Sequence, residues 1–180
     1  YETTPGIAGS APVRWPAGTR VPRTPGRATL VMLAHPHCPC TRASIGELAL
    51  LMTRLHGQVA AYILFQEAAG FSAERQESDL WKTAAAIPGV TVMADDGGKE
   101  GARFHAVVSG QTLLYDASGR LVFSGGITAS RGHSGDNAGR SAIVSLVTTG
   151  RAERTGTPVF GCSLRDPDRQ ELQRISSWKR

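Results

Sequence analysis

The stretch that decides the fold runs from Thr29 to Leu55 and reads TLVMLAHPHCPCTRASIGELALLMTRL. It opens with Thr29–Ala34, an apolar run that is typical of a buried strand. Residues that can bind metals or act as nucleophiles follow: His35, His37, Cys38 and Cys40. Apolar side chains then recur at the three- and four-residue spacing of a helix face: Ile45, Leu48, Met52 and Leu55. The stretch predicts a strand, a reactive loop and a helix, in that order.

The two thiols of this loop are expected at the start of the helix. Free backbone N–H groups and the helix dipole favour a thiolate there. We expect Cys40, nearer the helix, to have the lower pKa, and Cys38, nearer the loop tip, to be accessible to a partner. Cys38 is assigned as the attacking thiol and Cys40 as its stabilised partner, while Cys162, the third cysteine, can resolve either one. A Cys38–Cys40 disulfide would close a very small, strained ring and would exchange readily.

The rest of the chain continues the alternation of strands and helices. Buried-type strands joined by a helix form a parallel pair with a right-handed crossover, and the last two strands form a hairpin. The order is β-α-β-α-β-α-β-β-α, which predicts an α/β fold with a central mixed sheet flanked by helices. After the first strand and helix, the expected elements are strand Val59–Gln66, helix Ser72–Ala86, strand Val90–Ala94, helix Lys99–His105, strands Gln111–Asp116 and Gly119–Ser124, and helix Arg140–Thr149.

Segments of different composition flank this region. Residues 1–28 contain five prolines and predict an extended strap or linker. Residues 29–150 form the expected domain, and residues 151–180 form a polar C-terminal extension that carries Cys162. The first residue is tyrosine, so the sequence can be a trimmed form that lacks a leader or anchor.

The net charge of +5 is concentrated at the two ends of the chain. Residues 1–28 and residues 151–180 each carry a net +3, and residues 29–150 carry −1. A nucleic-acid partner is therefore not expected, because a basic stripe on the core is missing. Basic ends are compatible with association at an anionic membrane surface. No apolar run approaches the roughly 18 residues that a membrane-spanning helix needs.

Several motifs carry a resemblance to known proteins: HPHCPCTRASIGEL, IPGV, LLYDASGRLVFSGGIT, RGHSGDN and PVFGCSL. With these motifs and this element order, the chain resembles periplasmic thioredoxin-like proteins over roughly residues 28–162, and within them the bacterial group labelled RedB. The resemblance implies a thioredoxin-like fold and thiol–disulfide exchange with a protein partner, without a required cofactor. It also implies a location in the bacterial periplasm, with membrane anchoring through a segment outside this chain.

Two departures from the thioredoxin-like pattern bear on the chemistry. The family's active site is Cys-x-x-Cys, whereas this chain has Cys38-Pro39-Cys40. The family also has a proline, before the strand that faces the site, that helps to bind substrate and keeps metals off the thiols. Ser109-Gly110 stands in its place. Both departures weaken the argument for ordinary dithiol exchange and make metal binding by the thiols easier.

The alternative function is metal binding without catalytic turnover. Two thiolates from Cys38 and Cys40 and an imidazole from His35 or His37 suit copper or zinc, with His133 or Cys162 completing the set. His133 belongs to a glycine-rich loop, residues 125–139, which lacks the Lys-Ser/Thr ending of a phosphate-binding loop. A tight surface loop is the favoured interpretation of that segment. A redox-inert interaction domain is a third hypothesis.

Overall fold

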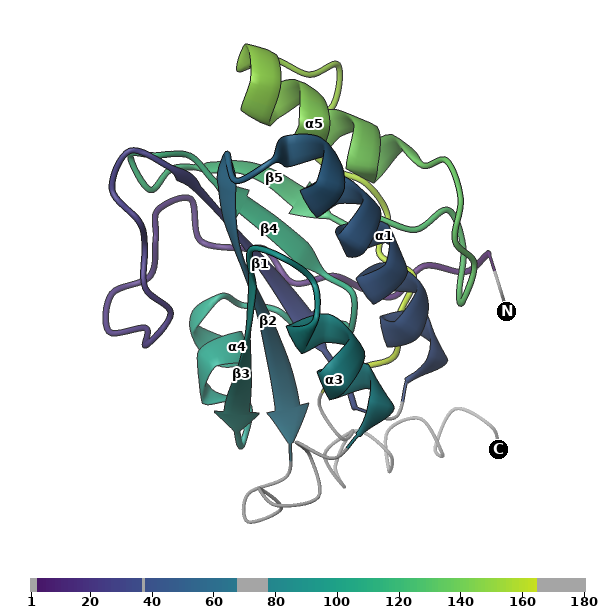
Figure 1. Cartoon of the computed structure of the whole chain (residues 1–180). Coiled ribbons are helices and arrows are strands. Elements are labelled where there is room, and N and C mark those ends of the chain that lie inside the picture. Colours follow the sequence, from purple (N-terminus) through teal and green to yellow (C-terminus); the bar gives the residue numbers. More distant parts are fainter. Residues whose placement is uncertain (1–2, 37, 68–77, 165–180) are drawn as a thin grey trace, which may run out of the picture.

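A computed structural model describes residues 3–36, 38–67 and 78–164 of the chain. It contains a five-stranded sheet with the strand order β3-β2-β1-β4-β5 (Figure 1). The strands are β1 (Ala28–Ala34), β2 (Val59–Glu67), β3 (Val90–Asp96), β4 (Thr112–Tyr115) and β5 (Leu121–Gly125). The helices are α1 (Pro39–Leu55), α3 (Asp79–Ala85), α4 (Lys99–Arg103) and α5 (Ala138–Thr149). This mixed sheet flanked by helices confirms the thioredoxin-like fold expected from the sequence.

Strand β1 is the centre of the sheet because its apolar run is covered on both faces. It pairs in parallel with β2, so that Leu33 faces Leu64, and antiparallel with β4, so that Val31 faces Leu113. Residues Leu30 to Ala34 have no exposed surface. A continuous apolar strand of this kind is stable only where side chains pack on both sides.

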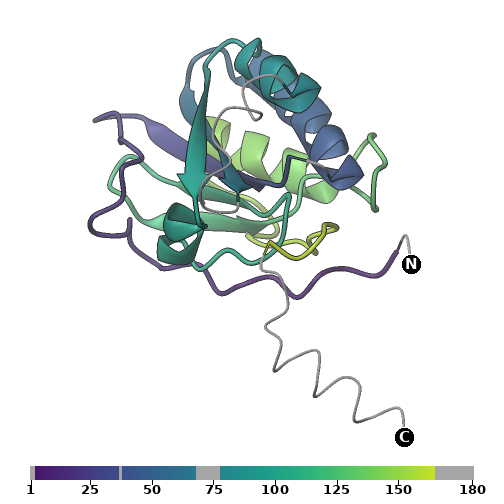
Figure 2. The ribbon, with the colours of Figure 1, turned by 90° about the horizontal axis from the view of Figure 1, so that it is seen from below.

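The helices and the N-terminal segment divide between the two faces of the sheet (Figure 2). Helices α1, α3 and α5 cover one face, where Ile45, Leu80 and Ile143 contribute to a shared apolar core. Helix α4 and the N-terminal segment cover the other face, where a second core includes Val21 and Phe104. Each face of β1 therefore has its own hydrophobic core.

Both flanking segments pack along the domain in their described parts. The Trp15 ring makes edge contacts with Phe104 and Tyr115, with ring centroids 5.3 and 5.1 Å apart. Gly6 donates a backbone hydrogen bond of 2.8 Å to the carbonyl of Val159, so the N-terminal and C-terminal segments also meet. These contacts attach the described parts of both flanking segments to the domain.

Some element boundaries differ from the sequence expectation. Helix α5 begins at Ala138, two residues earlier than expected, because the side chain of Asn137 caps it by accepting from the N–H of Arg140. Helix α4 ends at Arg103, and His105 follows with a positive φ of 51°. The predicted helix 72–86 is described from Asp79, behind a Ser78 cap, and its first part lies outside the described residues. In the described part of the chain, no helix has the length and apolar character needed to cross a membrane.

Candidate functional site

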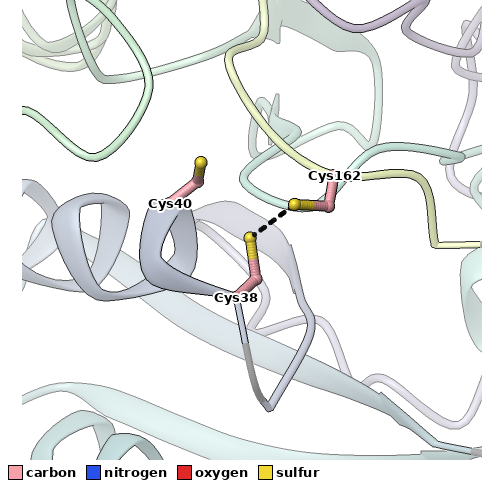
Figure 3. Close-up of side chains that lie close together, drawn as sticks. All are labelled: Cys38, Cys40 and Cys162. Atoms are coloured by element: carbon pink, nitrogen blue, oxygen red, sulfur yellow. Dashed lines mark hydrogen bonds between the residues drawn. The ribbon is translucent and has the colours of Figure 1, made fainter. Parts of the chain in front are cut away.

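The three cysteines meet beside the N-terminus of α1 (Figure 3). Cys38 and Cys40 come from the loop after β1, and Cys162 approaches from the C-terminal segment. The Sγ atoms of Cys38 and Cys162 are 3.1 Å apart, and all three sulfurs lie within 4.8 Å of one another. Cys38 and Cys40 are 3% and 4% exposed, whereas Cys162 is partly exposed. The fold thus gathers into one small volume three thiols that the sequence places in two distant segments.

Local hydrogen bonds fix the loop that holds Cys38. Helix α1 begins at Pro39, which makes Cys38 the N-cap residue, in an extended conformation. Proline suits this first helical position because its φ is already helical and it has no N–H to satisfy. The N–H of Cys38 donates to the carbonyl of His35 over 3.2 Å, and the N–H of His35 donates to Thr41 Oγ1 over 3.2 Å. These hydrogen bonds hold the backbone of Cys38 in place at the start of α1.

Backbone pairing holds Cys162 opposite Cys38. Ser109 donates its N–H to the carbonyl of Cys162 over 2.8 Å, and Leu164 donates to the carbonyl of Val107 over 2.9 Å. Arg131 Nη1 donates to the carbonyl of Gly161 over 2.6 Å. The side chain of Leu164 is also only 4% exposed, so the segment is anchored on both sides of the cysteine. Cys162 is consequently part of the folded domain.

The environment makes Cys38 the most acidic of the three thiols. Burial opposes its ionisation, but hydrogen bonds from the Cys162 side chain and from the backbone N–H groups of Thr41, Cys162 and Cys40 outweigh it. Together they lower the pKa of Cys38 to about 7. A thiol with this pKa is substantially ionised at neutral pH and is a competent nucleophile.

The other two thiols remain protonated at neutral pH. Burial, followed by the charge and hydrogen bond of Cys38, raises the pKa of Cys40, although Arg131 and the N–H of Gly132 partly oppose this. Burial and the hydrogen bond with Cys38 raise the pKa of Cys162 to about 12. The expectation that Cys40 has the lower pKa is therefore wrong. The expectation overlooked Cys162, whose side-chain hydrogen bond is the largest effect that lowers the pKa of Cys38, ahead of the backbone N–H groups of Thr41, Cys162 and Cys40.

Two of the histidines named as metal ligands, His35 and His133, are not part of the sulfur cluster. Among the described residues, the cluster of mutually close ligand atoms consists of the three cysteines alone. His35 follows the end of β1, and His133 lies in the 125–139 loop, where its N–H faces the carbonyl of Ser130 at 3.4 Å. His37 lies outside the described residues.

Three residues to which the sequence assigned no supporting role hold the site together. Thr41 Oγ1 and Ser109 Oγ form a buried hydrogen bond of 2.7 Å that joins α1 to the segment before β4. Arg131 links the two chain ends, because it contacts the carbonyl of Thr4 as well as that of Gly161. A hydrogen-bonded threonine and serine that are far apart in the sequence leave no recognisable spacing, and Arg131 is one of several polar residues in the 125–139 loop. Their roles depend on tertiary contacts.

The loop that carries Arg131 is fixed to α1 by a buried carboxylate. Glu47, with no exposed surface, accepts hydrogen bonds from Gly135 N–H over 2.7 Å and from Asn137 Nδ2 over 3.1 Å. It also pairs with Arg140 of α5. This cluster of Glu47, Gly135, Asn137 and Arg140, the Glu47 cluster, holds the 125–139 loop against α1, the helix that contains Cys40 and follows Cys38.

Comparisons with known proteins identify the fold. No family model and no curated protein matches the chain. An uncharacterized conserved protein from Geobacillus kaustophilus superposes with a TM-score of 0.65 at 19% identity, covering 92% of this chain and 94% of that one. A hypothetical protein from Sinorhizobium meliloti 1021 superposes with a TM-score of 0.65 at 22% identity, covering 89% and 93%. MTB dsbF, in its mixed oxidized and reduced forms, gives a TM-score of 0.50 at 14% identity, covering 69% and 81%. At these identities the similarity establishes the fold alone.

Proposed function

We propose that this thioredoxin-like domain carries out thiol–disulfide exchange with a protein partner, using Cys38 as the nucleophile and Cys162 as the resolving thiol. The observation that carries the proposal is the 3.1 Å separation of the two Sγ atoms. A disulfide bond is about 2.05 Å long, so a movement of about 1 Å is enough to close it. The lowered pKa of Cys38 supports its assignment as the attacking group.

The exchange balances as two successive displacements at sulfur. The Cys38 thiolate attacks a partner disulfide, forming a mixed disulfide and releasing one partner thiolate. Cys162 then loses its proton to that thiolate or to water and attacks Cys38 Sγ, which releases the second partner sulfur. The partner disulfide gains two electrons and the Cys38–Cys162 pair loses two. The reverse sequence oxidises a partner dithiol, and the relative reduction potentials determine the direction.

Cys162 suits the resolving role better than Cys40 does. A Cys38–Cys40 bridge would span a single proline and would need strained geometry within the first helical turn. A Cys38–Cys162 bridge needs no such strain, because backbone hydrogen bonds to residues 107–109 already hold the Cys162 segment with its Sγ 3.1 Å from that of Cys38. Cys40 then remains as a reduced thiol beside the bridge.

The fold supports this class of reaction and a bacterial setting. The similar fold of MTB dsbF, whose structure contains mixed oxidized and reduced forms, is compatible with a redox-active dithiol in this chain. We extend the proposal to the RedB group, to a periplasmic location and to association with the membrane surface through the basic chain ends. Fractionation of the native host, with detection of the full-length protein, tests the location.

The decisive experiment maps disulfides in the full chain after treatment with oxidised and reduced glutathione. Peptide mass spectrometry is expected to find a Cys38–Cys162 bridge under oxidising conditions that reductant reverses. The Cys162→Ser variant is expected to accumulate a stable mixed disulfide on Cys38, because the resolving thiol is lost. A Cys38–Cys40 bridge in the wild-type protein, or no mixed disulfide in the Cys162→Ser variant, would contradict the proposal.

A further inference from the structure

The geometry points to a Cu(I) site formed by the thiolates of Cys38, Cys40 and Cys162 in the reduced protein. This inference concerns the same three cysteines as the proposed exchange, but binding itself involves no electron transfer. Each cysteine that is still protonated releases its proton to solvent when it binds, the Cys38 thiolate binds directly, and the copper remains monovalent. Copper binding can therefore be measured separately from thiol–disulfide exchange.

The sulfur cluster has the size of a metal–thiolate site. Metal–sulfur bonds of about 2.3 Å around one ion place the sulfurs about 4 Å apart. The three Sγ atoms lie within 4.8 Å of one another, and the closest pair is 3.1 Å apart. Shifts of less than about 1 Å, within the range of a side-chain torsion adjustment, bring all three onto a single ion.

The composition of the cluster favours Cu(I) over zinc. Thiolates are soft ligands that select Cu(I) or Zn(II) among common metals. A structural zinc site needs about four protein ligands in a tetrahedron. Among the described residues, no imidazole or carboxylate joins the three sulfurs. Three thiolates without a fourth protein ligand fit a monovalent ion of low coordination number.

The surroundings can offset the negative charge of such a site. Three thiolates and one Cu(I) leave a net charge of −2, which is costly in a buried position unless it is compensated. The backbone N–H groups of Thr41 and Cys40 face Cys38, and that of Gly132 faces Cys40. The positive charge of Arg131 acts on both Cys40 and Cys162. The start of α1 adds the positive end of a helix dipole.

The site would exist only in the reduced protein. If the proposed exchange closes the Cys38–Cys162 disulfide, two of the three ligands are consumed and Cys40 alone remains. The two electrons go to the partner disulfide, and Cu(I) leaves without a change of oxidation state. Exchange and copper binding then exclude each other, which makes copper release responsive to a disulfide partner.

The test titrates Cu(I) into the full chain under anaerobic conditions, against the chromogenic chelator bicinchoninate. The reduced, metal-free protein is expected to take up a single equivalent, and the glutathione-oxidised protein is expected to take up none. Cys38→Ser, Cys40→Ser and Cys162→Ser are each expected to weaken binding by at least about tenfold. The matched control is His133→Ala, which is expected to bind within about twofold of wild type. Uptake of less than one equivalent, or wild-type affinity in any of the three cysteine variants, would overturn the inference.

A second measurement removes dependence on the folding of the variants. Cu(I) added to the wild-type protein is expected to protect all three cysteines from iodoacetamide together, and X-ray absorption should show three sulfurs as nearest neighbours. Protection of only two cysteines, or a nitrogen neighbour, would contradict the three-sulfur site. The Cys40→Ser variant distinguishes the two proposals, since it retains both members of the Cys38–Cys162 pair. The expected result in this variant is weakened copper binding with normal formation of the disulfide. Wild-type copper affinity in Cys40→Ser would overturn the copper inference and leave the exchange proposal standing.

Discussion

Gly161 passes so close to Ser109 that a Cβ atom on Gly161 would lie 1.7 Å from the Ser109 carbonyl oxygen. The obstacle is backbone, which cannot rotate away as a flexible side chain can. The same strand-like pairing brings the carbonyl of Cys162 within 2.8 Å of the Ser109 N–H. The absence of a side chain on Gly161 is therefore what allows Cys162 to reach Cys38.

Replacement of this glycine should separate the two sulfurs. In Gly161→Ala the C-terminal segment must move away from Ser109, so we expect at least about a tenfold lower rate of Cys38–Cys162 disulfide formation in glutathione buffer. The measurement is the rate of loss of two free thiols, followed by quenched alkylation and mass spectrometry. The control is Gly46→Ala in α1, where the nearest atom is the Ser134 hydroxyl at 3.8 Å, so the rate should not change. An unchanged rate in Gly161→Ala would show that the close approach does not position Cys162.

The acidity of Cys38 should be visible in its reactivity. In reduced, chelator-treated protein, alkylation of Cys38 by iodoacetamide should be slow below an apparent pKa of about 7 and reach a plateau above it. In Cys162→Ala the side-chain hydrogen bond that lowers the pKa is absent, so the midpoint should move to higher pH. Peptide-resolved alkylation rates between pH 5 and pH 10 check both. A midpoint that is unchanged in Cys162→Ala would contradict the assigned cause.

The strands and helices of this fold could be predicted from the sequence because the patterns that define them involve residues close together in the chain. The continuous apolar run of Leu30 to Ala34 is typical of a strand covered on both faces, and the spacing from Ile45 to Leu55 is typical of one face of a helix. The predicted pKa order was wrong because the largest effect that lowers the pKa of Cys38 is a hydrogen bond from Cys162, a residue far away in the sequence. The meeting of Cys38 with Cys162, 124 residues apart, depends on the path of the C-terminal segment along residues 107–109. No local pattern encodes that path.

Arg131 is expected to tune the two less acidic thiols. Its positive charge lowers the pKa of both Cys40 and Cys162 against the stronger effect of burial. Arg131→Met should therefore raise both pKa values and slow the alkylation of Cys40 and Cys162 at pH 9, because a smaller fraction of each thiol is ionised at that pH. Arg54→Met, near the end of α1, is the control and should leave these rates unchanged. Faster alkylation of Cys162 in Arg131→Met would instead indicate that loosening of the C-terminal segment dominates.

The Glu47 cluster should contribute strongly to stability. Glu47 is fully buried and accepts hydrogen bonds from Gly135 and Asn137 in addition to pairing with Arg140. Glu47→Gln removes the charge and leaves the largely buried Arg140 without its inner partner, which should lower the free energy of unfolding by about 3 kcal/mol. Urea denaturation followed by circular dichroism measures the change.

A second carboxylate on the same arginine provides the control for that measurement. Asp136 contacts Arg140 over 2.9 Å but is fully exposed, so Asp136→Asn should change the unfolding midpoint far less than Glu47→Gln does. Because the Glu47 cluster also holds the loop of Arg131 against α1, Glu47→Gln should in addition speed the alkylation of Cys162 under native conditions. Equal destabilisation by the two variants would contradict this prediction. It would mean that the buried contacts of Glu47, which attach this loop to α1, contribute no more to stability than the exposed contact of Asp136.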